Sequence, residues 1–285
     1  MFPRIIKNPK FILFITILCT ISLAAYSYLL SDQNILGKKT QESKIVSTSN
    51  SNQSQSQPQP AISPSPTPSP KLSKTTYTIA LYGDSMIDTM GENLDYLSKS
   101  LGALYPKTTF KFYNYGIGSQ NIEQGLARWD KEFQYQNRHY DPIDQIKPDV
   151  IVLGSFAYNP FPAHDKNRHY IKLKELVSKA KLYTANVYLL AEIAPLNNGF
   201  GRGPGGINWP EDLAAKQTNN IVEQLENPIT VSKSDNVTLI NAYKESLMIG
   251  KFGNPVYISS NDGIHPSVEG HVLMANLIAK TIKLK

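Results

Sequence analysis

The sequence has 285 residues, a length that allows one or two domains. Its formal net charge of +6 comes from residues 1–75, which carry eight Lys or Arg and two Asp or Glu, whereas residues 76–285 carry 21 of each sign. The larger part of the chain therefore has no excess positive charge for a phosphate backbone, which argues against a DNA- or RNA-binding domain. The single cysteine, Cys19, excludes an intramolecular disulfide framework and a cysteine-based zinc site.

The N-terminal region is predicted to direct and anchor the protein. Residues 1–10 hold three basic side chains and form a cytoplasmic segment, and residues 11–30 carry no charge. As a helix this uncharged run would be roughly 30 Å long, the thickness of a bilayer core. The positive-inside rule then places the following residues outside the cytoplasm. We predict an uncleaved transmembrane signal anchor in the cell membrane; the alternative is a signal peptide cleaved near Ala24 and Ala25.

Residues 31–75 are predicted to be a disordered linker. Ten Ser and six Pro lie between residues 41 and 76, among very few apolar side chains. Proline removes amide donors and favours an extended, solvated chain, so this stretch cannot bury a core. A spacer is the prediction, and a proline-rich partner motif or a glycosylated stalk remains open as an alternative.

From residue 76 onward, apolar runs typical of strands alternate with amphipathic stretches typical of helices. Strands are predicted at residues 77–82, 110–115, 149–153, 187–193 and 237–240. Helices are predicted at residues 92–105, after 121, at 166–181, at 210–226 and from 267 onward. This alternation predicts an α/β fold over residues 76–285, a three-layer α/β/α sandwich around one five-stranded parallel sheet. Ligands in such folds bind beyond the carboxyl ends of the strands.

Two motifs contain a candidate nucleophile and its base. Gly83-Asp84-Ser85 follows the first strand, where main-chain amides and a helix dipole favour developing negative charge. Asp262-Gly263-Ile264-His265-Pro266 precedes the last helix. Serine needs an adjacent base, which His265 offers, and Asp262 could orient its ring. Taken singly, Ser85 is also interpretable as a helix cap and His265 as a surface loop residue.

Together these motifs resemble the first and last sequence blocks of the SGNH hydrolases, also called GDSL esterases and lipases. The resemblance covers residues 76–285. It implies a flavodoxin-like fold and a serine esterase whose catalytic triad is Ser85, His265 and Asp262, with no metal and no cofactor. In that reaction His265 takes the proton of Ser85, which attacks an ester carbonyl, and water later releases the acyl group.

The same resemblance assigns the oxyanion hole to the main-chain amides of Ser85 and Ser119 and to the side chain of Asn159. Ser119 stands where the family usually has glycine, so the main-chain donor is kept but the preferred φ differs. Asn159 comes two residues later than the family's asparagine. The loss of one such donor typically costs about 10²–10³ in rate. Further substrate-binding residues are expected at Asp84, Gly118, Tyr158 and Arg202.

Two other features have less specific patterns. Residues 197–206 hold five glycines around Arg202 but lack the Gly-Lys-Ser/Thr ending of a phosphate loop, so we predict a mobile rim or lid of the site. A metal site is conceivable at His164, Asp165 and His169, but no further residues with ligand spacing surround them. We therefore interpret these three as part of a solvated loop and the start of a helix.

The whole pattern predicts a membrane-tethered, extracytoplasmic serine esterase that hydrolyses O-acyl esters, chiefly O-acetyl groups on polysaccharide. The substrate follows from the predicted location and not from pocket residues. One alternative is an O-acyltransferase that passes the acyl group to a cell-surface glycan. The other is a non-catalytic glycan-binding domain on the same fold, which the two altered oxyanion motifs favour.

Overall fold

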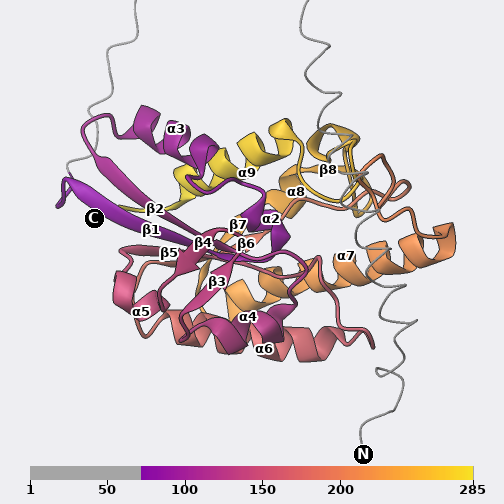
Figure 1. Ribbon diagram of the computed structural model, residues 1–285, viewed down its shortest axis with the longest axis horizontal. Helices are drawn as coiled ribbons and strands as arrows, with labels where there is room; N and C mark the ends of the chain where they lie inside the picture. The colour runs from indigo at the N-terminus through magenta and orange to yellow at the C-terminus, as the bar shows by residue number, and fades with distance from the viewer. Residues whose placement is uncertain (1–71, 285) are drawn as a thin grey trace, which may run out of the picture. The chain divides into compact units, whose positions relative to one another are not determined.

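The computed structural model describes residues 72–284. One five-stranded parallel sheet in the order β2-β1-β5-β6-β7 forms the centre of this part, as predicted (Figure 1). If the five strands are numbered by their order along the chain, their order across the sheet is 2-1-3-4-5, as in flavodoxin-like folds. The strands are β1 (Thr76–Gly83), β2 (Thr109–Gly116), β5 (Val150–Gly154), β6 (Val187–Ala191) and β7 (Thr238–Asn241).

The predicted transmembrane anchor at residues 11–30 and nearly all of the predicted linker lie outside the described residues. Within residues 72–284, no helix has both the length and the apolar character needed to cross a bilayer.

Helices cover both faces of the sheet. On one face α3 (Asp95–Leu104) packs against α9 (Val268–Thr281). On the other face lie α4 (Ile122–Arg128), α6 (Lys166–Ala180) and α7 (Glu211–Ser234), with α6 packed against both α4 and α7 (Figure 1). Because all five strands are parallel, the loops that follow their carboxyl ends meet at one edge of the sheet.

The hydrophobic core has two parts, one on each face of the sheet, because successive strand side chains point to opposite faces. In β1, Ile79 and Leu81 enter one part while Ala80 and Tyr82 enter the other, and all four are fully buried. All five residues of β5 are buried. This pattern is expected of a parallel strand that helices cover on both sides.

Two helices differ from their predicted limits. The α3 helix begins later than predicted, because Leu94 before it has a left-handed backbone with a φ of 50°. The α7 helix passes through Pro228 and ends well beyond residue 226. Asn227, a buried residue beside that proline, donates a hydrogen bond to the main-chain oxygen of Lys166 at 2.9 Å. Packing against α6 therefore outweighs the lost amide donor of the proline.

Several short elements were not predicted. They include two antiparallel hairpins, one of β3 (Phe133–Tyr135) with β4 (Arg138–Tyr140), the other of β8 (Leu247–Ile249) with β9 (Phe252–Gly253). The others are the short helices α2 (Ser85–Asp88), α5 (Ile143–Ile146) and α8 (Ala242–Glu245) and the 3-10 helix η2 (Pro255–Tyr257). Elements of two to four residues are too short to show a period of two or of 3.6 in the sequence.

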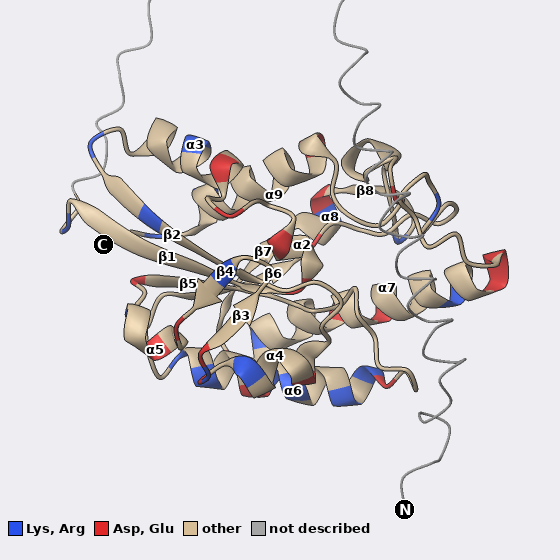
Figure 2. Ribbon diagram, in the orientation of Figure 1, with Lys and Arg blue, Asp and Glu red and all other residues tan. Residues whose placement is uncertain are grey.

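The charges of α6 are balanced by neighbouring acids (Figure 2). Its five basic side chains each form an ion pair; Lys166, Arg168, Lys172, Lys174 and Lys179 pair respectively with Glu226, Glu123, Glu175, Asp235 and Asp130. The helix therefore has paired charges instead of an unpaired basic stripe.

Candidate active site

Ser85 is the first residue of α2, directly after β1. Asp84 caps this helix, and its carboxylate accepts a hydrogen bond from the amide of Met86 at 3.0 Å. Gly83 has no room for a side chain, because a Cβ there would lie 2.4 Å from Ile87 Cγ1. Among the described residues the amide of Ser85 has no hydrogen-bond partner, as the first amides of a helix have none within it. The turn thus presents a half-buried hydroxyl group and a free N–H.

Asp84 is completely buried. Its Oδ2 accepts a hydrogen bond from Asn159 Nδ2 at 2.9 Å. Burial raises the pKa of Asp84 to about 6, although the hydrogen bonds from Met86 and Asn159 and the charge of His265 act to lower it. Asp84 was expected to contact substrate; in the structure its buried carboxylate bonds to the amide of Met86 and to the side chain of Asn159, which holds α2 and Asn159 in place.

The loop before α9 contains a histidine–carboxylate pair. His265 Nδ1 lies 3.0 Å from Asp262 Oδ2, while Asp262 Oδ1 accepts the amides of Ile264 at 2.8 Å and of His265 at 2.9 Å. Burial alone would raise the pKa of Asp262, but the hydrogen bonds from His265 and Ile264 outweigh it and hold this pKa below its usual value. The carboxylate is therefore ionised at neutral pH and fixes the orientation of the ring.

The charge of His265 is one of the influences that lower the pKa of Asp84, the residue before Ser85. Within residues 72–284 no hydrogen bond joins the Ser85 hydroxyl to the His265 ring. Such bonds are often long in substrate-free sites and shorten when substrate binds.

The other two predicted oxyanion donors, Ser119 and Asn159, lie on loops with unusual backbone conformations. Ser119 has a φ of 59°, in the left-handed region that favours glycine, and its amide has no partner among residues 72–284. Asn159 gives one side-chain N–H to Asp84, which leaves the second for another acceptor. Phe156, buried in the same loop as Asn159, has a φ of 58°. Backbone strain of this kind is concentrated at functional sites.

Main-chain atoms of the glycine-rich segment, residues 197–206, contact main-chain atoms of the loop that carries His265. The amide of Gly205 donates to Asn261 O at 2.8 Å. A Cβ at Gly203 would lie 2.3 Å from Asn261 O, and one at Gly263 would lie 2.3 Å from Gly199 O. Gly203 and Gly263 therefore have no room for a side chain, and the glycine-rich segment packs directly against the loop that holds the histidine–carboxylate pair.

Comparison with known proteins identifies the family of this chain. Residues 79–278 match the GDSL-like lipase/acylhydrolase family. The chain belongs to that family. It is therefore an ester-hydrolysing enzyme, which confirms the resemblance to the SGNH hydrolases.

Solved structures of GDSL hydrolases share the fold. A GDSL-like lipase from Bacteroides thetaiotaomicron is 17% identical with a TM-score of 0.51, over 72% of this chain and 86% of that one. The lipase/acylhydrolase from Enterococcus faecalis is 20% identical with a TM-score of 0.52, over 73% and 98%. The search of curated proteins returns no match.

The structure describes the surroundings of the three other residues that were predicted to bind substrate in this GDSL hydrolase. The amide of Gly118 already donates to Tyr135 Oη at 3.2 Å. Tyr158 is 4% exposed and its hydroxyl donates to Ile193 O at 2.9 Å, so its ring packs in the core. Arg202 is exposed and lines a cavity of about 100 Å³ between the glycine-rich segment and the start of α7.

The histidines considered as metal ligands have different partners. His164 Nε2 lies 2.9 Å from Glu223 Oε2, and Asp165 caps α6. His169 is buried, with its Nε2 2.8 Å from Ser155 O, and burial lowers its pKa to about 4. Over residues 72–284, no group of three or more His, Cys, Asp or Glu side chains is arranged to hold a metal ion.

Two buried charged residues near the site of this GDSL hydrolase were not predicted from the sequence. Arg128 Nη2 donates to Gly83 O at 2.8 Å and to Tyr115 O at 2.9 Å, which joins the carboxyl ends of β1 and β2. Glu192 accepts the amide of Ser155 at 2.7 Å. Burial raises the pKa of Glu192 to about 8, and the charge of Asp84 adds to the shift. A carboxylate inside an apolar strand run was a visible signal for Glu192, whereas Arg128 had none.

Proposed function

We propose that this GDSL hydrolase cleaves esters by acyl transfer through Ser85, with His265 as general base and Asp262 orienting the imidazole. The observation that carries the proposal is the 3.0 Å contact between His265 Nδ1 and Asp262 Oδ2. Because the carboxylate accepts a hydrogen bond from Nδ1–H, the neutral ring has its lone pair on Nε2. That lone pair is able to accept the serine proton.

The reaction has two acyl-transfer steps. Ser85 Oγ attacks the ester carbonyl carbon while its proton moves to His265 Nε2, and the amides of Ser85 and Ser119 with the Asn159 side chain stabilise the oxyanion. His265 then protonates the leaving alcohol as its bond to the carbonyl carbon breaks. Water, deprotonated by His265, attacks the acyl-serine and releases a carboxylic acid and free Ser85.

The alcohol part of the substrate in this proposal is a polysaccharide that bears O-acetyl groups. Two cavities flank Arg138, with volumes of about 250 Å³ and 390 Å³. Their walls include a carboxylate, amides and aromatic rings, contributed by Glu92, Asn93, Asn137 and Tyr113. Such groups hydrogen-bond hydroxyls or stack on apolar faces. The uncharged run at residues 11–30 supports placement outside the cytoplasm on a membrane anchor.

Hydrolysis of p-nitrophenyl acetate by the purified full chain tests the chemistry. Ser85→Ala should lower the rate by several orders of magnitude, while Ser98→Ala, which removes an exposed hydroxyl on α3, should leave it unchanged. Full activity in Ser85→Ala would overturn the proposal. Acetate release from acetylated polysaccharide, compared with acetyl transfer to an added oligosaccharide, distinguishes an esterase from an acyltransferase. Fractionation of cells that produce the chain tests the anchor.

A further inference from the structure

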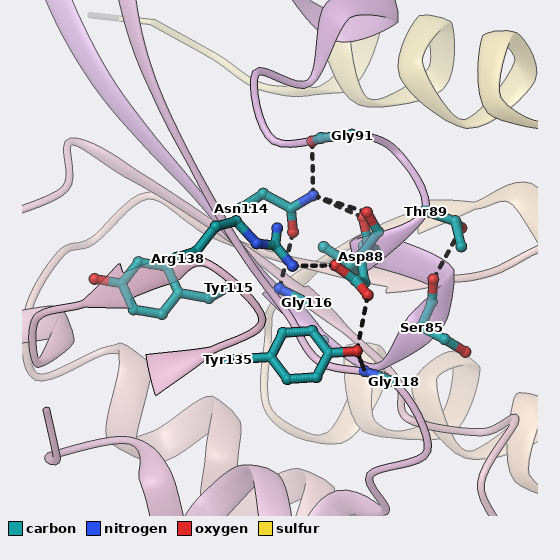
Figure 3. Close-up of polar contacts among 12 residues, drawn as sticks. Ser85, Asp88, Thr89, Gly91, Asn114, Tyr115, Gly116, Gly118, Tyr135 and Arg138 are labelled. Atoms are coloured by element: carbon teal, nitrogen blue, oxygen red, sulfur yellow. Dashed lines mark hydrogen bonds and ion pairs between the residues drawn. The ribbon is translucent and has the colours of Figure 1, made fainter. Parts of the chain in front are cut away.

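The β3–β4 hairpin contacts both the nucleophile helix and the loop that carries Ser119 (Figure 3). Tyr135 Oη accepts the amide N–H of Gly118 at 3.2 Å and donates its own proton to Asp88 Oδ2, also at 3.2 Å. Arg138 forms an ion pair with the other oxygen of Asp88. One side chain of the hairpin therefore joins the last residue of α2 to the residue before Ser119.

We propose that Tyr135, held by the Asp88–Arg138 ion pair, is a positioning residue for the oxyanion hole. The proposal rests on the function proposed above. Stabilisation of an oxyanion requires its donors to be fixed before the charge develops. Ser85 and Ser119 supply two of those donors from different loops, and Asp88 and Gly118 are the points at which the hairpin fixes each loop.

The surroundings of this hydroxyl suit a fixed connection. The side chains of Asp88 and Arg138 are only 14% and 13% exposed, so water screens their ion pair less than a surface pair. Gly118 has no side chain to displace the hydroxyl, since a Cβ there would lie 2.9 Å from Tyr135 Oη.

Asn114 fixes the end of α2 from the side of β2. Its Nδ2 donates to Ile87 O at 2.9 Å and to Gly91 O at 2.8 Å. Its Oδ1 accepts the amide of Gly116 at 2.8 Å. With α2 fixed in this way, the hydrogen bond of Tyr135 determines where the Gly118–Ser119 segment lies relative to it.

Tyr135→Phe in the full chain tests the inference, because it removes only the hydroxyl group. We expect kcat for p-nitrophenyl acetate to fall about tenfold with KM within about twofold of wild type, since the donors matter in the transition state. Tyr140→Phe is the matched control in the same hairpin. Its buried hydroxyl has no hydrogen-bond partner within the described residues, so kcat should be unchanged.

Gly118→Ala displaces the same hydroxyl from the other side and keeps the test valid if Tyr135→Phe does not fold. It should show the same loss of kcat, and the double variant should lose no more than the larger single loss. Wild-type kcat in either folded single variant, additive losses in the double variant, or a change in KM alone overturns the inference. Activity retained in Ser85→Ala would refute the proposed function instead, whatever the hairpin variants show.

Discussion

Replacing Asp262 by Asn is expected to keep the catalytic loop folded and to disable the base. The Asn side chain has the same shape, so its Oδ1 can still accept the amides of Ile264 and His265, now at 2.8 Å and 2.9 Å. Its Nδ2 would replace Oδ2 opposite His265 Nδ1, and two N–H donors cannot face each other. The ring would therefore carry its proton on Nε2, where no lone pair remains for the serine proton.

The magnitude follows from the bonds that are kept and lost. A wrong tautomer in a serine triad lowers kcat by about 10⁴, and we expect a loss of that order with little change in KM. The charge-assisted hydrogen bond between Asp262 and His265 is replaced by a neutral one, so the free energy of unfolding should fall by about 1 kcal/mol. Asp262→Ala, which also removes both main-chain contacts, should be less stable than Asp262→Asn.

Steady-state hydrolysis of p-nitrophenyl acetate and urea unfolding measure these two quantities on the same protein samples. A folded Asp262→Asn enzyme that keeps more than about a tenth of the wild-type kcat would refute the tautomer argument. Equal stability of the Asn and Ala variants would show instead that the main-chain contacts of Asp262 do not hold the loop.

Three further predictions concern backbone strain and buried charge. Ser119→Gly should keep kcat and raise the free energy of unfolding by up to about 1 kcal/mol, because it relieves a left-handed φ of 59°; destabilisation in urea would contradict this. The wild-type protein should lose stability as pH rises from about 5 to 8, because folding raises the pKa of the Glu192 carboxyl to about 8 and the folded protein therefore binds a proton that the unfolded chain has released. Glu192→Gln removes this titration, so its free energy of unfolding should depend less on pH over that range. Urea unfolding at both pH values measures the difference, and parallel pH dependence in the two proteins would refute it. Gly203→Ala should lower kcat, because its Cβ would lie 2.3 Å from Asn261 O, while Gly250→Ala, at a positive φ with no atom within 4 Å, should leave the rate unchanged.

The sheet and the main helices were predictable because their signals are local. The apolar run of β5 (Val150–Gly154) and the cap of α9 by Ser267 each occupy a few adjacent residues. Asp262 and His265 are three positions apart, so their pairing was also visible in the sequence. The predicted end of α7 at residue 226 was wrong, because a tertiary contact outweighed the usual effect of proline on a helix.

The support of the site was not predictable, because it consists of long-range contacts. Asp84 meets Asn159 across 75 positions, and Tyr135 meets Asp88 across 47. The burial of Asp84 depends on the completed sheet, and no local pattern separates such a carboxylate from one that faces substrate. Tyr135 lies in a three-residue strand, too short for its alternation to be recognised.

The contact between residues 199–205 and 261–263 has a consequence for redesign of this enzyme. Because a side chain at Gly203 or Gly263 would come within 2.3 Å of a main-chain oxygen of the other stretch, a larger residue at either position must displace that stretch. Natural variants are expected to change length in both stretches or in neither. A new substrate specificity transplanted from another hydrolase should accordingly exchange the two stretches as one unit.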